Sequence, residues 1–308
     1  MPGTRDIRRR IKSVKSTAQI TRAMQMVAAS KMSRAQQVAL AGRAYAEELN
    51  CMLASVRGAL VNEEISHPLL EKREERQPCV LLITTDKGLC GGLNTNLFKE
   101  AANLPSHAHF ISIGRKGRQF LARVHRNLVA DFEFKENITH DAIKPVVNFL
   151  MSRFLNREAD SIHILYPDFI NTLVQRPRLI KLLPIADLSQ IQATTALDNH
   201  QASQTASMDS THQQQQGLPG QQEQNYLFEP NLFYILDKLL PYYIDFMFYQ
   251  IMLDARAAEH SARMVAMKNA SDNAREIIKE LTLEYNKARQ ASITNEILEI
   301  STAQMALN

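Results

Sequence analysis

Long runs without glycine or proline occupy both ends of the chain. Residues 4–41 contain neither residue type, and residues 242–308 contain neither. Both runs are rich in Ala, Met, Lys, Arg, Glu and Gln, which favour helix. At 1.5 Å per residue, a continuous C-terminal helix would be about 100 Å long, several times the length of an ordinary globular helix. A helix of that length cannot be buried in a compact domain, so the two runs predict an antiparallel pair that forms a shaft.

Apolar and small residues in both runs follow the spacing of a coiled-coil seam, stepping by four and three. The seam positions are Ile7, Ile11, Val14, Ala18 and Thr21 in the first run and Met267, Ser271, Ala274, Ile278, Leu281, Tyr285 and Ala288 in the second. Beyond Ala288 the apolar positions are Ile293, Ile297 and Ile300, which the shorter N-terminal helix cannot cover. Because a lone helix with exposed aliphatic residues is unstable in water, we expect a partner to surround this tip.

Between the helical runs, short apolar segments alternate with helical patterns. Strands are predicted over residues 80–84, 110–113, 128–134 and 162–166, with an edge strand over 173–183. Helices are predicted over 94–103, 116–125 and 141–156, with Pro145 in the first turn of the last one. Alternating strands and helices indicate a small α/β domain with a mainly parallel sheet.

The predicted fold class is therefore mixed α+β, with a long antiparallel coiled coil of the N- and C-terminal helices and a small α/β domain. The predicted boundaries are a coiled-coil helix over 1–60, a connector over 61–78, the α/β domain over 79–187, a Gln-rich flexible insertion over 188–225 and a coiled-coil helix over 226–308. The insertion lacks Lys and Arg and is rich in Gln, Ser and Thr, a composition that cannot bury enough apolar surface to order itself.

Charge and cysteine usage narrow the possible partners and compartments. The formal net charge is only +4, but in residues 1–43 a stripe of arginines and lysines faces a single acid, Asp6. Such a stripe implies an acidic partner, which could be protein, nucleic acid or lipid headgroups. The odd count of three cysteines, without zinc-site spacing, indicates a reducing compartment. Charges within the most apolar stretch, residues 232–253, argue against a membrane span.

Cys90 raises an alternative enzymatic interpretation. Residues 88–92 read GLCGG, the cysteine form of the nucleophile elbow, between a predicted strand and a predicted helix. The α/β region is small for a hydrolase, and no signal places a partner histidine. The glycines equally suit a tight turn and close helix packing. We therefore predict no catalytic residue, and Cys90 hydrolase chemistry remains the alternative to test.

The sequence gives little support for a cofactor, metal or nucleic-acid site. No phosphate-binding glycine loop occurs, and His107 and His109 have no third ligand at useful spacing, so no cofactor and no metal are expected. The arginine run at residues 8–10 could contact nucleic acid, although no aromatic stacking platform accompanies it. A partner-facing helix surface is the preferred interpretation.

Three long segments, in order, resemble the gamma subunit of F-type ATP synthase. The first comprises RDIRRRIKSVK at residues 5–15 and ITRAMQMVAASKM at 20–32. The second is DKGLCGGLN at 86–94. The third comprises MVAMKNASDNA at 264–274 and YNKARQASITNEILEI at 285–300. The match covers both ends and the middle domain, which makes it highly specific.

The resemblance implies a rotating, non-catalytic central stalk. Its partners would be the alpha and beta subunits of the head, the epsilon subunit and the membrane c-ring. It would bind no nucleic acid, would associate with the membrane only indirectly, and would lie peripherally at the cytoplasmic face of the bacterial inner membrane. Residues that would meet the alpha/beta ring are Arg8, Arg9, Met24, Arg289, Gln290, Thr294 and Ile297. Tyr226 and Glu229 would form the foot on the rotor ring.

Departures from the family pattern are mild. Lys87 stands where the family often has Arg, and Ser301-Thr302-Ala303 replaces the common Ser-Gly-Ala, which predicts a slightly stiffer tip. The Gln-rich insertion lies where plant chloroplast members carry a redox loop. It contains no cysteine, so thiol regulation there is excluded, and we predict that it is dispensable.

Overall fold

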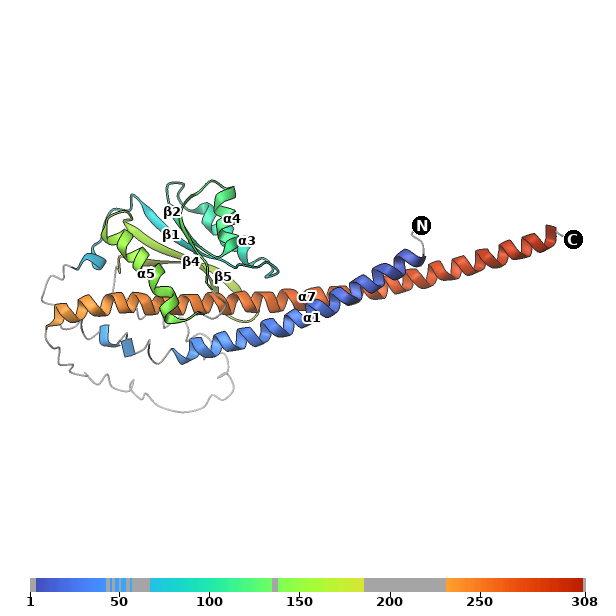
Figure 1. Cartoon of the computed structure of the whole chain (residues 1–308), viewed down its shortest axis with the longest axis horizontal. Coiled ribbons are helices and arrows are strands. Elements are labelled where there is room, and N and C mark those ends of the chain that lie inside the picture. The colour runs from blue at the N-terminus through green and yellow to red at the C-terminus, as the bar shows by residue number, and fades with distance from the viewer. Residues whose placement is uncertain are drawn as a thin grey trace, which may run out of the picture.

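A computed structural model describes residues 4–42, 67–134, 138–185 and 231–306, together with residues 45, 48, 49, 51–53 and 56. Two helices dominate it: α1 (Thr4–Ala41) and α7 (Leu232–Ala306, 75 residues). They run antiparallel, and α7 continues well beyond the start of α1 (Figure 1). At 1.5 Å per residue α7 is about 110 Å long. The predicted antiparallel shaft is confirmed.

The end of α1 differs from the sequence-based one. A single helix is predicted over residues 4–60, but α1 ends at Ala41, just before Gly42, a residue common after helix C-termini. The described residues between 45 and 56 are again helical. At the other end, α7 lies within the predicted range of 226–308 and includes Pro241. Burial of Leu236, Leu240 and Ile244 in the main core offsets the lost backbone bond.

The α/β domain is built on one sheet of five strands. These are β1 (Pro78–Ile83), β2 (His109–Ile113), β3 (Asn127–Phe132), β4 (Ser161–Phe169) and β5 (Gln175–Leu183). Their spatial order is β3-β2-β1-β4-β5. The pairs β1–β2, β1–β4 and β2–β3 are parallel, whereas β5 joins β4 antiparallel as an edge strand. The mainly parallel sheet and its added edge strand are both as predicted.

Helices cover both faces of this sheet, as the alternation along β1 requires. Leu81 and Ile83 belong to the core shared with α5 (His140–Leu155) and α7. Val80 and Leu82 belong to a second core beneath α3 (Leu93–Asn103) and α4 (Arg115–Arg123). A short 3-10 helix, η1 (Pro68–Leu70), precedes β1. The shaft helix α7 is thus also one layer of the domain (Figure 1).

The predicted position of Pro145 is wrong in one respect. Pro145 lies inside α5 rather than in its first turn, because α5 begins at His140. A proline there forgoes one backbone hydrogen bond. Burial of Ile143, Val146 and Val147 against the sheet holds the helix in spite of that loss.

Candidate partner-binding surfaces

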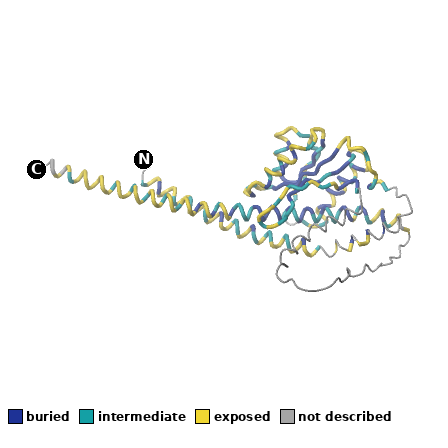
Figure 2. The backbone as a smooth tube through the Cα atoms, turned by 180° about the vertical axis from the view of Figure 1, so that it is seen from behind, coloured by how far each residue is buried: buried dark blue, intermediate teal, exposed yellow. Residues whose placement is uncertain are grey.

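The distal part of α7 is exposed on all sides. Figure 2 shows that burial concentrates in the α/β domain and the adjoining part of α7, while the far end of the shaft is mostly exposed. Ile293 is 48% exposed, Ile297 60% and Ile300 68%. Several exposed aliphatic side chains close together on one helix are typical of a surface that another protein covers. The prediction that α1 does not reach the tip is confirmed.

The polar residues predicted at the tip share this exposure. Arg289, Gln290 and Thr294 are all exposed on α7. The Thr294 hydroxyl donates to the Gln290 carbonyl oxygen at 2.9 Å, which satisfies the donor of the hydroxyl within its own helix. The Arg289 guanidinium, the Gln290 amide and the acceptor lone pairs of the Thr294 hydroxyl therefore remain able to bind a partner.

At the start of α1, the basic residues point away from the helix pair. Ile7 is buried, at 2% exposure, whereas Arg8 and Arg9 beside it are exposed. The helical period places these arginines off the seam that contacts α7. Their guanidinium groups are thus presented to the surroundings of the shaft.

Met24 lies in a groove where α1, α7 and the domain meet. One hollow of about 540 Å³ is lined by Met24 and Val27 of α1 and by the loop that follows β1. A second hollow of about 610 Å³ is lined by Val38 of α1, with Thr139 and Tyr249 opposite. Both hollows include Lys31, Arg256 and His260, so they form one groove, which we call the junction groove.

The junction groove is predominantly basic. Its charged lining residues are Lys31, Arg34, Lys87, Arg115, Arg256 and Arg263, against Asp86 and Glu259. Apolar side chains such as Met24 and Val27 lie among them. A groove with apolar walls and an excess of cations suits an acidic amphipathic segment.

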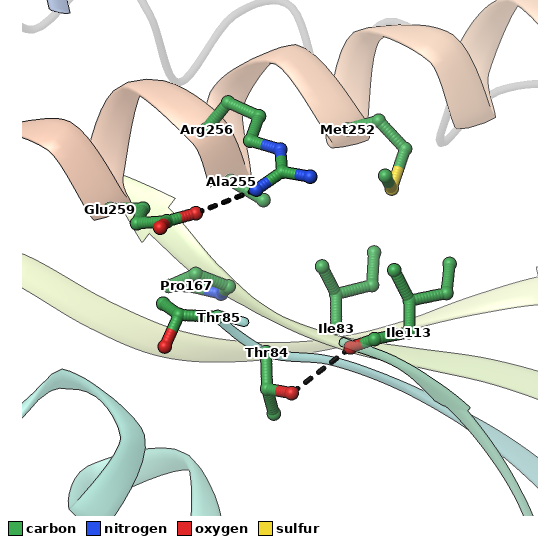
Figure 3. Close-up of a pocket in the computed structure, with 9 residues that line it drawn as sticks. All are labelled: Ile83, Thr84, Thr85, Ile113, Pro167, Met252, Ala255, Arg256 and Glu259. Atoms are coloured by element: carbon green, nitrogen blue, oxygen red, sulfur yellow. Dashed lines mark hydrogen bonds and ion pairs between the residues drawn. The ribbon is translucent and has the colours of Figure 1, made fainter. Parts of the chain in front are cut away.

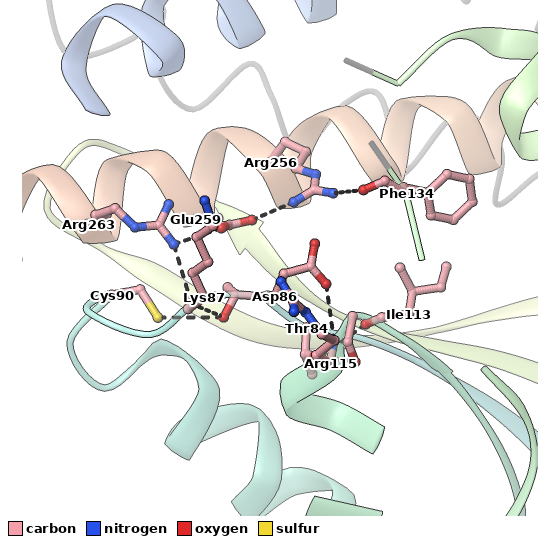
Figure 4. Close-up of polar contacts among 12 residues, drawn as sticks. Thr84, Asp86, Lys87, Cys90, Ile113, Arg115, Phe134, Arg256, Glu259 and Arg263 are labelled. Carbon is pink, nitrogen blue, oxygen red and sulfur yellow. Dashed lines mark hydrogen bonds and ion pairs between the residues drawn. The ribbon is translucent and has the colours of Figure 1, made fainter. Parts of the chain in front are cut away.

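Sequence reasoning missed a buried ionic cluster at the edge of this groove. Glu259 accepts from Arg256 at 2.9 Å and from Arg263 at 2.8 Å (Figure 4). The Glu259 side chain is 8% exposed, and the two arginine side chains are 15% and 13% exposed. The i, i+3 and i+4 spacing of these residues on a helix is visible in the sequence. Their burial depends on packing against the α/β domain, and the sequence alone does not reveal it.

His260 follows Glu259 and is also buried. Burial lowers the pKa of His260, an effect that the nearby Glu259 opposes and Arg263, Arg256 and Lys31 reinforce. Its Nδ1 is enclosed and has no hydrogen-bond partner among the described residues. The histidine therefore favours its neutral form.

Cys90 is built into a structural turn. Its exposure is 3%, and it packs against Leu93 and against Ala262 of α7. The Asn94 side-chain amide donates to Sγ at 3.4 Å, and the Thr85 hydroxyl lies 3.9 Å from it. Among the described residues, no histidine is in hydrogen-bond contact with Cys90. These contacts favour the tight-turn interpretation of the GLCGG segment over the nucleophile elbow.

A small part of the crevice at the carboxyl ends of β1 and β2 lies directly beneath α7, whereas the junction groove opens beside the loops that follow these strands. Parallel α/β sheets commonly bind ligands there. Met252, Ala255 and Glu259 of α7 lie over Thr84 and Thr85, and the remaining cavity is about 10 Å³ (Figure 3). That volume is enough for about one water molecule and too small for a nucleotide.

Three further points concern the predicted c-ring contacts, metal binding and membrane crossing. Tyr226, Glu229 and the insertion over 188–225 lie outside the described residues. Within the described ranges, no group of three His, Cys, Asp or Glu side chains could hold a metal ion. No helix formed by the described residues is long and apolar enough to cross a membrane.

Comparison with known proteins agrees with this architecture. A family model described as ATP synthase matches residues 3–307. An ATP synthase gamma chain from Opitutus terrae is 48% identical over 306 residues, with 99% of each chain covered. The gamma chain from Akkermansia muciniphila is 43% identical over 308 residues, with both chains fully covered.

Solved structures share the fold. The Euglena gracilis mitochondrial ATP synthase, in a structure with OSCP, F1 and c-ring, contains a chain that matches with a TM-score of 0.63 at 17% identity, covering 99% of this chain and 94% of that one. A central stalk and c-ring structure from Tetrahymena thermophila contains one that matches at 0.56 and 22% identity, covering 82% and 99%. From its full-length match to these relatives, the chain belongs to the gamma-chain family of ATP synthase.

Proposed function

We infer that this chain is the central-stalk rotor subunit of an F-type ATP synthase. Rotation would couple ion flow through the membrane sector to ATP synthesis or hydrolysis in the alpha/beta ring. The observation that carries this inference is the single helix α7, which spans the domain and then extends as an exposed tip. A shaft anchored in a domain at one end can transmit torque between a partner that surrounds its tip and a partner at its base.

The chain would supply no catalytic residue of its own. The nucleotide sites would lie on the beta subunits, and the asymmetric shaft would force the three sites into different states. The burial of Cys90 between Leu93 and Ala262 argues against the cysteine-nucleophile alternative, because the thiol is not accessible to a substrate.

Specific contacts follow from the exposed residues. Arg289, Gln290, Thr294 and Ile297 would contact the inner surface of the alpha/beta ring, with the aliphatic tip bearing load through few fixed polar bonds. Arg8 and Arg9 would pair with carboxylates around the shaft, since guanidinium–carboxylate pairs are strong and directional. Met24, in the basic junction groove, would face an acidic segment of beta.

The base of the stalk would carry the remaining partners. Tyr226 and Glu229 would contact the membrane c-ring, and the epsilon subunit would bind beside the α/β domain. The chain would then be a peripheral protein at the cytoplasmic face of the bacterial inner membrane. The absence of a membrane-crossing helix among the described residues is compatible with indirect attachment.

ATPase turnover of purified alpha and beta subunits, with and without this chain, tests the proposal. We expect the chain to give a stable complex with sustained turnover. Removal of residues 293–308, or Ile297→Asp in the exposed tip, should weaken that gain because either change removes apolar contact with the ring. The matched control is Val124→Asp, which alters an aliphatic residue 45% exposed just after α4 in the α/β domain, away from the tip. A chain that neither co-elutes with alpha and beta nor changes their turnover would refute the rotor assignment, and Cys90→Ala would then test hydrolase chemistry.

A further inference from the structure

A short segment of α7, residues 256–263, binds several loops of the α/β domain. Arg263 Nη2 lies 3.4 Å from the carbonyl oxygen of Lys87 and 3.5 Å from that of Gly88 (Figure 4). Beside it, Ala262 packs against Cys90 in the same loop. The loop that follows β1 is therefore held to α7 by both polar and apolar contacts.

The same segment binds two further parts of the domain. The Ser261 hydroxyl, fully buried, donates to the Thr172 carbonyl oxygen at 2.7 Å, and Gln175 donates to Ser261 Oγ at 3.3 Å. These residues hold the turn between β4 and β5. Arg256 Nη2 lies 3.5 Å from the Phe134 carbonyl oxygen, just after β3. Three loops from different strands thus converge on two turns of one helix.

Glu259 fixes the two arginines that make the outer contacts. Its carboxylate accepts from Arg256 through Oε2 and from Arg263 through Oε1, so each oxygen holds one guanidinium. All three side chains are nearly buried, and breaking a buried ion pair from one side leaves an uncompensated charge. Glu259 consequently determines where both arginines can reach.

The segment lies where α7 leaves the domain toward the tip (Figure 1). Nearer the tip, Ala266 lies close to Gly91 of the loop that follows β1, where an added Cβ would be 3.9 Å from Ala266 Cβ. Torque applied at the tip therefore reaches the domain within or just beside this segment. The earlier part of α7 contacts the domain through apolar side chains such as Phe248, Met252 and Ala255. Apolar packing has little directionality, whereas hydrogen bonds to backbone carbonyls resist sliding and rotation.

We propose that residues 256–263 form a torque joint between the shaft and the α/β domain, with Glu259 as its positioning residue. This inference rests on the proposed rotor function, because the joint matters only in a chain that turns. Without the Glu259 charge, Arg256 and Arg263 repel each other and the loop contacts loosen. The domain can then slip relative to the shaft, so that part of each stroke turns the shaft without turning the domain.

The test compares variants in the complete ATP synthase in membrane vesicles, measuring ions pumped per ATP hydrolysed. Glu259→Gln should lower the number of ions pumped per ATP hydrolysed several-fold, and this ratio does not depend on how fast the complex turns over. The control, Asp272→Asn, removes an exposed i, i+3 pair with Arg275 on the same helix and should leave the ratio unchanged. Glu259→Asp, which restores the charge, should recover part of the ratio.

Each outcome decides for or against the joint. An unchanged ratio in Glu259→Gln would overturn it, and so would a parallel fall in hydrolysis and pumping, which indicates general destabilisation. If Glu259→Gln does not assemble, Arg263→Lys provides the second test. This variant keeps the positive charge beside Glu259 but loses the guanidinium that reaches two carbonyl oxygens, so the pumping ratio should fall. An unchanged ratio would refute the joint. If the unmodified chain supports no coupled pumping, the rotor function itself fails, independently of these variants.

Discussion

At the residue scale, glycine is required where the loop after β2 passes close to β1. Gly114 has a φ of +94°, and a Cβ at this position would lie 2.3 Å from the Thr84 carbonyl oxygen. We expect Gly114→Ala to lower the free energy of unfolding by about 1–3 kcal/mol or more, because both strain and a backbone clash arise. Thermal or denaturant unfolding of the purified chain measures the loss.

Gly88→Ala is the matched control for that substitution. A Cβ at Gly88 meets no atom within 4 Å, and its carbonyl contact with Arg263 does not depend on the side chain. Its stability should match that of the unmodified chain. Equal stability of the two alanine variants would contradict the close approach at Gly114.

His260 predicts a pH dependence of stability. Burial places its pKa below the ordinary histidine value of about 6.5, so below that pH the unfolded chain takes up a proton that the folded chain resists. The contribution of neutral His260 to the free energy of unfolding is fully present above pH 6.5 and decreases as the pH falls toward the pKa of His260 in the folded chain. Melting temperatures measured from pH 8 to pH 5 should therefore fall less steeply in His260→Gln than in the unmodified chain. His163, whose pKa burial also lowers, is present in both proteins and cancels in the comparison. Parallel curves would exclude a role for His260.

At the element scale, small residues set how closely α1 and α7 approach. Ala28 is 2% exposed on α1, whereas Ala23, on the same helix, is exposed. We expect Ala28→Leu to cost about 1–3 kcal/mol, because the added methyl and methylene groups overfill a packed seam. Ala23→Leu should cost far less. Unfolding of both variants, followed by circular dichroism at 222 nm, provides the comparison, and similar losses would place the seam elsewhere.

The burial of the seam residues shows how far hydrophobic periodicity predicts the contacts of α7. Met267, Ser271 and Ala274 are buried as the spacing predicts, while Leu281 and Tyr285 are only partly buried, because a two-helix shaft covers each helix on one side. The end of α1 was harder to place. Gly42 ends α1 well before the predicted residue 60, whereas α7 lies within its predicted range of 226–308 and tertiary burial holds it through Pro241. Local signals locate an element, but long-range packing determines its length.

At the scale of the whole molecule, the antiparallel shaft, the mainly parallel sheet and the exposed tip follow from sequence patterns. The predicted tip residues Arg289, Gln290 and Thr294 are exposed together, and Met24 lies in a basic groove. What the sequence could not reveal is the relation between the parts. The Arg256–Glu259–Arg263 cluster has a helical spacing that an exposed surface would also show, and only the packed domain makes it a buried contact.

The pairing of α1 with α7 has a consequence for biosynthesis. The helix α1 is synthesised before α7, and 265 residues, from residue 42 to residue 306, must be added after α1 before α7 is complete. At a translation rate of about 5–20 residues per second, α1 remains unpaired for roughly 15–60 s before α7 is complete. Its contact face offers mostly small or modest side chains, including Thr21, Ala28 and Ala39, which limits the apolar surface exposed to aggregation during that interval. The helix α1 can therefore avoid aggregation while it is unpaired, and the shaft is completed only once α7 has been synthesised.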